Sequence, residues 1–467
     1  MEKQNSLKVK VGYGIGAVGK DMVYMLSASY ILYYYQDLLG VSAWIMGVIL
    51  LVARVFDAFN DPIMGVIVAK TRTKWGKFRP WLLIGTLTNA VILVLMFACP
   101  PSLSGSGLAA YAAVFYILWG VTYTMMDIPY WSMVPALTES GKERENLSAL
   151  ARSCAGVGSS IIVVVTMLAV TGLGKLFGGS GLDENALEIV GFKWFALIVA
   201  VIFAVFIVIT CIAVKENPTT DMKTASVKDM FRALIENDQA MIVVVAIVLV
   251  NTAVYLTSNL LIYFFKYDLA GANWKGDYTL FNTFGGAMQI IAMMFFFPLL
   301  RKFFNIAKMY YVAVLSAVSG YVILLAISIL GLNNVFVFFV PGFFIFSSVG
   351  LLNVIVTVFL ANSVDYGEYK NYRRDESVIF SMQTFVVKLA SGLSALLASL
   401  CLQIFNISKD EEAVTTLAGG SVMGLRMTMT LIPMIGLTVA FIVFKKKFIL
   451  TDSEVERINK EIKARNN

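Results

Sequence analysis

The chain has 467 residues, of which 58% are hydrophobic and 14% charged, with a mean hydropathy of +0.78 and a net charge of +7. Soluble domains are about half apolar and a quarter charged, so this composition excludes a soluble protein and indicates a polytopic membrane protein. The positive charges are spread over separate loops between apolar segments, which excludes a nucleic-acid-binding protein, and no segment is long enough for a further soluble domain.

Long apolar runs recur from one end of the chain to the other. A helix needs about 20 apolar residues to cross the hydrocarbon core, and these runs lack the alternation of a transmembrane β-barrel. We therefore predict an all-α membrane protein with twelve transmembrane helices. The predicted spans are 11–39, 41–69, 80–98, 108–133, 147–170, 193–214, 239–266, 276–300, 307–330, 334–361, 377–405 and 420–444.

The charges of the loops predict how these spans cross the membrane. Lysine and arginine recur in every second loop, whereas 99–107 has no charge and 409–412 is acidic. Positively charged loops stay in the cytoplasm, so we expect a multi-pass protein of the bacterial inner membrane with both termini cytoplasmic. The basic segments are 70–79, 142–152, 215–232, 301–308, 370–374 and 445–447.

The first span carries Lys20 and Asp21. These charges interrupt the apolar run and no small-residue cleavage site follows it, so we predict a cytoplasmic tail and a span rather than a signal peptide. A charged side chain in mid-span costs about 2.5 to 3.5 kcal/mol, and such residues face an aqueous cavity or a partner. Charges inside spans are therefore the candidate functional residues.

The second span carries an oxygen-rich cluster near its midpoint. Asp57, Asn60 and Asp61 are spaced i, i+3 and i+4, which places them on one face of a helix. Two carboxylates and an amide oxygen suit a hard cation, and a bound Na⁺ or a shared proton would relieve the repulsion between the carboxylates. The alternative is an internal salt bridge to Arg54 or Lys388.

The loop after the second span contains Lys77 and Arg79. These residues can dock on helix ends or acidic groups and so close the cytoplasmic end of a cavity. Asp365, Glu368 and Arg373 can play the same part in the second half of the chain. A signal for membrane topology alone explains the same residues, so the pattern is consistent with gating and with topology.

The fourth span has aromatic residues on both sides of a carboxylate. Tyr123, Asp127 and Trp131 recur every fourth residue and share a face, and the adjacent Thr124 can turn its hydroxyl toward the second span. This arrangement is typical of sugar binding, because the acid accepts hydroxyl hydrogen bonds while the indole stacks on the sugar. The alternative is an aromatic belt at the membrane interface, which an aspartate inside the span disfavours.

The longest polar stretch, 214–239, divides the chain into two halves of six spans. This is the layout of the major facilitator fold, in which two six-helix bundles hold a substrate site between them. We predict a first bundle at 1–214, a cytoplasmic central loop at 215–238, a second bundle at 239–446 and a solvated cytoplasmic tail at 447–467. The alternative for the tail is a short amphipathic helix.

The eleventh span carries Gln383, Thr384 and Lys388. Lys388 is a lone cation in mid-membrane and is expected to seek Asp57, Asp127 or both. A lysine that moves between two carboxylates would link ion binding to sugar binding.

Enzymatic chemistry is disfavoured by composition. The chain has no histidine, and its four cysteines lack metal-binding spacing. We therefore expect no enzyme and no cofactor other than a coupling ion, and proton coupling would have to use carboxylates. Buried opposing charges in paired halves favour a carrier over a channel.

Six motifs stand in order along the chain: GAVGKD at 16–21, LVARVFDAFNDPIMG at 51–65, WGKFRPW at 75–81, ILWGVTYTMMDIPYWSMVP at 117–135, VDYGEY at 364–369 and QTFVVK at 383–388. Together they resemble the glycoside–pentoside–hexuronide:cation symporter family over nearly the whole chain. The resemblance implies alternating-access symport of a glycoside, such as melibiose or a related galactoside, with Na⁺ or alternatively H⁺ or Li⁺. A glucuronide, a pentoside or a lysolipid-like amphiphile is the alternative cargo. The other expected partner is membrane lipid, and the expected functional form is a monomer.

The resemblance also implies roles for single residues. Na⁺ would bind at Asp57 and Asp61, with Asn60 and Thr124 completing the cation site. One position departs from the family, because Asn353 stands in span ten where carriers of melibiose have a tryptophan, which removes a stacking wall. The implied sugar-binding residues are Lys20, Asp21, Tyr123, Asp127, Trp131, Arg152, Gln383, Thr384 and Lys388.

Overall fold

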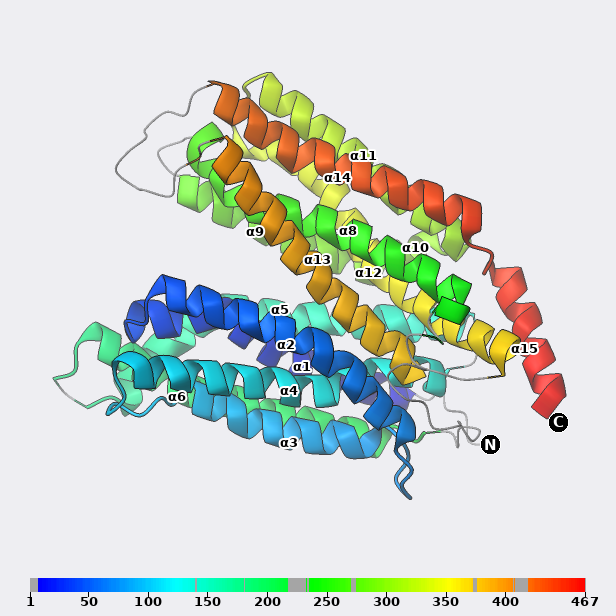
Figure 1. The fold of residues 1–467 in the computed structure, drawn as a ribbon, viewed down its shortest axis with the longest axis horizontal. Coiled ribbons are helices and arrows are strands. Elements are labelled where there is room, and N and C mark those ends of the chain that lie inside the picture. The colour runs from blue at the N-terminus through cyan, green and yellow to red at the C-terminus, as the bar shows by residue number, and fades with distance from the viewer. Residues whose placement is uncertain are drawn as a thin grey trace. The chain divides into compact units, whose positions relative to one another are not determined.

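The computed structural model describes residues 7–138, 141–179, 181–216, 232, 235–269, 274–372, 376–405, 407 and 419–466. Within these ranges every regular element is a helix, and each of the twelve predicted spans corresponds to a long helix (Figure 1). The predicted all-α fold is therefore confirmed.

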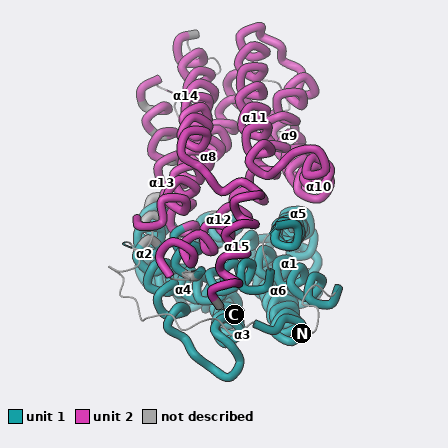
Figure 2. Tube along the Cα trace, turned by 90° about the vertical axis from the view of Figure 1, so that its right-hand side faces the viewer, with its two compact units in different colours: residues 1–233, 373–382 teal, residues 234–372, 383–467 magenta. Residues whose placement is uncertain are grey.

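The chain divides into two compact units (Figure 2). Unit 1 comprises residues 1–233 and 373–382, and unit 2 comprises residues 234–372 and 383–467. The helices of unit 1 are α1 (Leu7–Leu32), η1 (Tyr33–Leu38), α2 (Ala43–Lys70), α3 (Arg79–Met96), α4 (Gly105–Leu137), α5 (Lys142–Phe177) and α6 (Glu184–Ala213). The helices of unit 2 are α8 (Asp238–Tyr263), η2 (Phe264–Leu269), α9 (Trp274–Ile291), η3 (Ala292–Phe296), α10 (Phe297–Leu300), α11 (Ile306–Ile329), α12 (Val335–Asn371), α14 (Gly419–Lys447) and α15 (Asp452–Asn466).

One helix, α13 (Glu376–Ile404), is shared between the units. Its first turns, up to residue 382, belong to unit 1, and the rest of the helix belongs to unit 2. Val378 of α13 packs against Val66 of α2 in a small apolar cluster of unit 1. The beginning of the eleventh span is thus grouped with the first unit, and the predicted boundaries of the two six-helix bundles stay a prediction.

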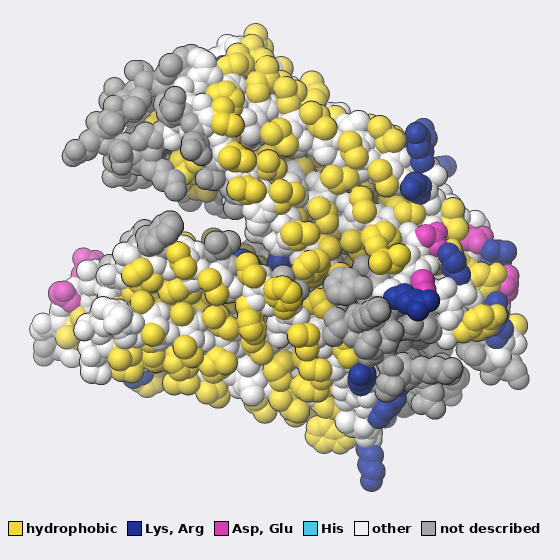
Figure 3. Space-filling view, viewed as in Figure 1, with side chains coloured by type: hydrophobic (Ala, Val, Ile, Leu, Met, Phe, Trp, Pro, Cys, Tyr) yellow, Lys and Arg dark blue, Asp and Glu magenta, His cyan; other side chains and the backbone are white. Residues whose placement is uncertain are grey.

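Ten helices in the described part of the chain are long and apolar enough to cross a membrane. Helices α1 and α2 are outside that set, and they carry Lys20, Asp21, Asp57 and Asp61 in their middle turns. Apolar side chains cover the sides of the helices in the space-filling view, whereas Lys and Arg side chains gather toward one end of them (Figure 3). This distribution fits helices that stand in lipid with basic residues at one interface.

Side-chain caps determine where several helices begin. The amide of Ala186 donates to Asp183 at the start of α6 at 2.9 Å, and the amide of Ala240 donates to Asn237 at the start of α8 at 3.0 Å. A cap satisfies amide groups that the first helical turn leaves without partners. Helix α6 consequently begins at Glu184, before the apolar run at 193–214 that predicted the span.

Small residues let the helices of unit 1 approach closely. Helix α1 packs against α5 and α6, while α4 packs against α2 and α3. A Cβ on Gly158 of α5 would clash with the backbone of Val18 on α1, and a Cβ on Gly85 of α3 would lie 2.8 Å from the amide nitrogen of Met126 on α4. Close backbone contacts of this kind hold the charged residues of α1, α2, α4 and α5 in a defined arrangement.

The segment after residue 447 forms the amphipathic helix that was the alternative to a solvated tail. This helix is α15, which packs against α12 in unit 2. Leu450, Val455 and Ile458 are buried and form an apolar cluster with Tyr366, against which Ile462 also packs. Val455, Ile458 and Ile462 are spaced i, i+3 and i+7, so a mostly charged helix still presents one apolar stripe.

Candidate functional site

The oxygen-rich cluster of the second span lies on α2, where α2 packs against α4. Asp61 is fully buried and Asp57 is 8% exposed. Thr124 of α4 donates its hydroxyl hydrogen to Asp61 Oδ1 at 2.9 Å. Asn60 is half-buried on α2, and its Nδ2 atom has no hydrogen-bond partner among the described residues. The fold therefore gathers the four residues of the predicted cation site at the contact of two helices.

Asp57 meets α4 one helical turn away, at Gly120. A Cβ built on Gly120 would lie 2.9 Å from Asp57 Oδ1. The pairs Asp57–Gly120 and Asp61–Thr124 are thus successive steps of the α2–α4 contact. Pro62, which follows Asp61 inside α2, has no amide hydrogen and cannot donate the helix bond to the carbonyl four residues earlier. Carboxylate, hydroxyl and carbonyl oxygens are the ligands that hard cations take.

Replacing Gly120 with alanine is expected to weaken cation binding by roughly tenfold. The added methyl group would overpack the α2–α4 contact and force the Asp57 carboxylate to move, and overpacking of this kind costs about 1 to 3 kcal/mol. Titration calorimetry of the purified protein with Na⁺ measures the effect. Gly47→Ala is the matched control, because a Cβ on Gly47 of α2 has nothing within 4 Å. An unchanged affinity in Gly120→Ala would contradict a cation at Asp57.

Lys20 of α1 is the centre of a second polar cluster. Its Nζ atom lies 2.7 Å from Asp127 Oδ1 and 3.0 Å from Asp21 Oδ2, and the residue is only 3% exposed. Lys20 also donates a hydrogen bond to the Tyr123 hydroxyl at 3.3 Å. Helices α1 and α4 therefore bring four of the predicted sugar-site residues into one network, in which Lys20 and Asp127 are buried and Asp21 and Tyr123 are half-buried.

Trp131 of α4 faces positive charge. The central carbon of the Arg152 guanidinium lies 3.8 Å from the centroid of the Trp131 ring, and Lys20 Nζ lies 5.0 Å from the same point. Both separations are within the range of cation–π attraction. A face of the indole that we predicted to stack on a sugar is therefore covered by Arg152 of α5, and a sugar that stacks there must displace the guanidinium.

Three aromatic residues of this cluster were missed by sequence reasoning. Tyr13 and Tyr130 stack with ring centroids 4.4 Å apart, and each hydroxyl donates to the other residue's carbonyl oxygen, at 2.5 and 2.6 Å. Trp119 stacks on Tyr123 with centroids 5.3 Å apart. Helical spacing contains the signal, since Tyr13 precedes Lys20 by two turns and Trp119 precedes Tyr123 by one turn.

The remaining predicted sugar-site residues belong to unit 2. Gln383, Thr384 and Lys388 are half-buried on α13. Asn353, which stands in place of the expected tryptophan, is half-buried on α12, and its carbonyl accepts a hydrogen bond from Thr357 at 2.9 Å. Their contribution to sugar binding stays a prediction.

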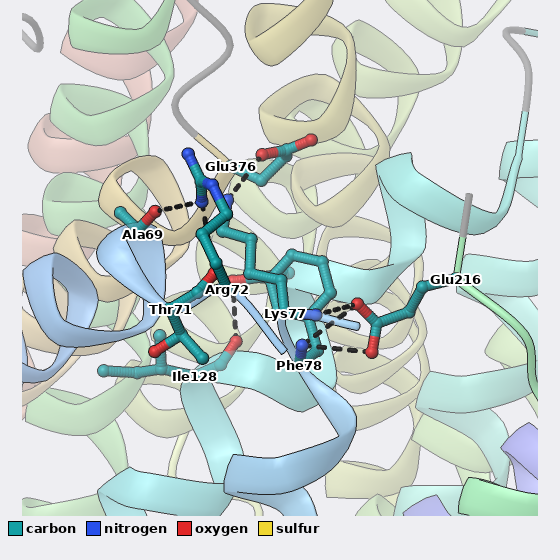
Figure 4. Close-up of polar contacts among 9 residues, drawn as sticks. Ala69, Thr71, Arg72, Lys77, Phe78, Ile128, Glu216 and Glu376 are labelled. Atoms are coloured by element: carbon teal, nitrogen blue, oxygen red, sulfur yellow. Dashed lines mark hydrogen bonds and ion pairs between the residues drawn. The ribbon is translucent and has the colours of Figure 1, made fainter. Parts of the chain in front are cut away.

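The basic loop between α2 and α3 is held by two carboxylates (Figure 4). Lys77 Nζ lies 3.3 Å from Glu376 Oε2 at the start of α13, and both side chains are buried. Arg79 Nε lies 3.8 Å from Glu216 Oε1. Sequence reasoning missed Glu216, because it is an isolated charge with no periodic partner.

The predicted gating residues of the second half are placed in part. Asp365 is buried on α12, and Glu368 is half-buried near the end of the same helix. Arg373 lies outside the described residues. A role for these three residues in gating stays a prediction.

Comparisons with known proteins identify the family and the fold of the chain. The model of a family described as MFS/sugar transport protein matches residues 12–447. An isoprimeverose transporter of Lactiplantibacillus pentosus is 30% identical over 84% of this chain and 79% of that protein. A lactose permease of Lactobacillus delbrueckii subsp. bulgaricus is 27% identical over 97% of this chain and 72% of that protein. The solved structure of the Escherichia coli fucose:proton symporter FucP, in a variant form, shares the fold with a TM-score of 0.69 at 14% identity and covers 95% of this chain and 98% of that one.

Proposed function

Because the chain belongs to the MFS/sugar transport protein family, we propose that it is a symporter that carries a small glycoside into the cell together with a monovalent cation. The family and the major facilitator fold make the protein a membrane transporter and not an enzyme. The motif-based resemblance to cation-coupled glycoside symporters is confirmed at this level. The cargo, the ion and the coupling are the content of the proposal.

One turn of α4 contributes a residue to the Asp57–Asp61 cluster and a residue to the Lys20 cluster, and the proposal rests on this observation. Thr124 donates to Asp61 at 2.9 Å, and Asp127, three residues later, lies 2.7 Å from Lys20. A cation that orders Asp61 and Thr124 therefore acts on the helical turn that presents Asp127. Each ligand then stabilises the site of the other, which is the thermodynamic requirement for coupled transport.

The proposed cation site consists of Asp57 and Asp61, with Asn60 and Thr124 beside them. Both carboxylates are buried at the α2–α4 contact, where a bound cation relieves their mutual repulsion. We assign Na⁺ to this site because the two carboxylates, the Asn60 side chain and the Thr124 hydroxyl offer oxygen ligands. H⁺ or Li⁺ is the alternative ion, and a proton would use the same carboxylates because the chain has no histidine.

The proposed sugar site is built around Lys20. Asp21 and Asp127 accept hydrogen bonds from sugar hydroxyls, Arg152 donates to sugar oxygens, and Trp131 stacks on the ring once the guanidinium has moved. The relatives named for isoprimeverose and lactose support a glycoside as cargo. We propose melibiose or a related galactoside. A glucuronide or pentoside is the alternative, because Asn353 removes the stacking wall expected for melibiose. The unit 2 residues proposed to complete the site are Gln383, Thr384 and Lys388.

The Lys77–Glu376 pair is proposed to close the cytoplasmic end during alternating access. Lys77 belongs to the basic loop, and Glu376 begins the helix that continues into unit 2. A buried ion pair with one partner on this helix is a contact that must break for the cytoplasmic end to open. This assignment places the basic loops and both termini in the cytoplasm of a bacterial cell.

The ion supplies enough free energy for accumulation. One positive charge that enters across 100 mV contributes about 2.3 kcal/mol. A tenfold ion gradient adds about 1.4 kcal/mol. Together they sustain a sugar gradient of roughly a few hundredfold.

Uptake into proteoliposomes tests the proposal directly. A panel of labelled α-galactosides, β-galactosides, glucuronides, pentosides and a lysolipid is offered with Na⁺, Li⁺ or H⁺ gradients, and with choline as the control. We expect one glycoside class to accumulate, with at least tenfold stimulation by one of the ions. Uptake that ignores every ion, or transport of a lysolipid in place of all the glycosides, would contradict symport of a sugar.

A further inference from the structure

Glu216 accepts hydrogen bonds from the backbone amide groups at the start of α3. Its carboxylate accepts hydrogen bonds from the backbone amides of Lys77 at 2.5 Å, Phe78 at 3.0 Å and Arg79 at 2.7 Å, and its side chain is only 5% exposed (Figure 4). The first amides of a helix have no partner inside it and carry partial positive charge. A single carboxylate therefore binds three consecutive donors and fixes the backbone at the end of the loop.

The loop is shaped to admit this carboxylate. Gly76 adopts φ +107°, a left-handed conformation that side-chain-bearing residues rarely adopt. A Cβ on Gly76 would lie 2.5 to 2.6 Å from the carboxylate atoms of Glu216. Thr73 supports the same turn, because its hydroxyl donates to the carbonyl of Gly76 at 2.7 Å. The closeness of fit indicates a specific contact rather than an accidental one.

Lys77 connects this contact to the proposed gate. Its backbone amide is bound by Glu216, while its side chain reaches Glu376 at 3.3 Å. Both side chains of that pair are buried, with 5% of Lys77 and none of Glu376 exposed. The position of the ammonium group therefore depends on the backbone that Glu216 holds.

We propose that Glu216 is a positioning residue of the gate, which holds Lys77 where it meets Glu376. This inference rests on the proposed role of the Lys77–Glu376 pair in closing the cytoplasmic end. Glu216 follows Val214 and Lys215 after the end of α6 at Ala213, and the chain then continues in sequence toward unit 2. Glu216 thus links the connection between the two halves to the loop that carries the gate.

Cysteine accessibility measures the state of the gate. Val378 follows Glu376 by two residues, is 1% exposed and packs against Val66. A cysteine at this position, Val378→Cys, therefore becomes accessible to reagents when the Lys77–Glu376 contact opens. The reporter is placed in a background without the four native cysteines, and inside-out vesicles are treated with a membrane-impermeant maleimide. We expect Glu216→Gln and Glu376→Gln each to raise the rate of alkylation about fivefold or more. Glu184→Gln is the matched control, because Glu184 is exposed at the start of α6, and it should leave the rate unchanged.

The double variant separates positioning from general loosening. If Glu216 acts through Lys77, Glu216→Gln combined with Glu376→Gln should alkylate no faster than Glu376→Gln alone. Multiplied effects, or no effect of Glu216→Gln beside a clear effect of Glu376→Gln, would overturn the positioning role and leave the gate intact. No effect of Glu376→Gln would overturn the gate itself. Na⁺ affinity is measured by calorimetry on the same proteins and should stay within twofold of the unmodified protein in Glu216→Gln. An unchanged affinity excludes global unfolding as the cause of faster alkylation.

Discussion

Replacing Asp61 with asparagine is expected to abolish cation-stimulated uptake and to weaken Na⁺ binding by roughly 100-fold. Asp61 is fully buried and accepts the hydroxyl of Thr124 at 2.9 Å, so its charge is a principal source of attraction for a cation at the α2–α4 contact. Losing a charged ligand from a buried site removes about 3 kcal/mol of binding free energy. Uptake with and without Na⁺, together with titration calorimetry, measures both effects.

Variants of Thr124 and Glu184 show whether the effect of Asp61→Asn on Na⁺ binding is specific. Thr124→Val removes a single hydrogen bond and should weaken Na⁺ binding by about tenfold, while Thr124→Ser should restore it. Glu184→Gln removes an exposed carboxylate of the same unit and should change nothing. Retention of full Na⁺ stimulation in Asp61→Asn would place the coupling ion elsewhere in the protein.

Replacing Lys20 with methionine is expected to abolish sugar binding and to destabilise unit 1. The ammonium group lies within 3.0 Å of both Asp21 and Asp127, and its loss leaves the buried Asp127 and the half-buried Asp21 without this shared countercharge. Removing one partner of a buried ion pair costs about 3 to 5 kcal/mol. Equilibrium dialysis with a transported glycoside measures binding, and the apparent melting temperature in detergent measures stability.

A triple variant in which Lys20 and both of its aspartate partners are made neutral separates the loss of sugar binding from the loss of stability. Combining Lys20→Met with Asp21→Asn and Asp127→Asn removes the uncompensated charge, so the melting temperature should recover while sugar binding stays absent. A triple variant as unstable as Lys20→Met would show that Lys20 does more than balance charge. Normal sugar binding in Lys20→Met would remove this cluster from the sugar site.

Helical spacing predicted which residues share a face. Asp57 and Asp61 lie on the face of α2 that meets α4, and Asp127 and Trp131 lie together with Lys20 at the contact of α1 and α4. Spacing alone does not determine which face of one helix meets which face of another. The sequence suggested Lys388 as a partner of Asp57 or Asp127, and the structure places Lys20 of α1 2.7 Å from Asp127.

Features without a periodic pattern were beyond sequence reasoning. Glu216 is a single acidic residue after an apolar span, and its role becomes visible only when the amides at the start of α3 are seen to point at it. The charge of the last twenty residues outweighed the apolar stripe of α15 that packs on α12. The stacking of the Arg152 guanidinium on the Trp131 ring likewise could not be predicted from sequence spacing, because the two residues belong to different helices.

The division of α13 between the units has a consequence for biosynthesis. Glu376 and Val378 belong to the first unit, although the ribosome makes them after α8 to α12 of the second. Until the first turns of α13, up to residue 382, have been synthesised and inserted, Lys77 and Val66 cannot make their contacts with this helix. These two contacts of the amino-terminal half can consequently form only late in translation.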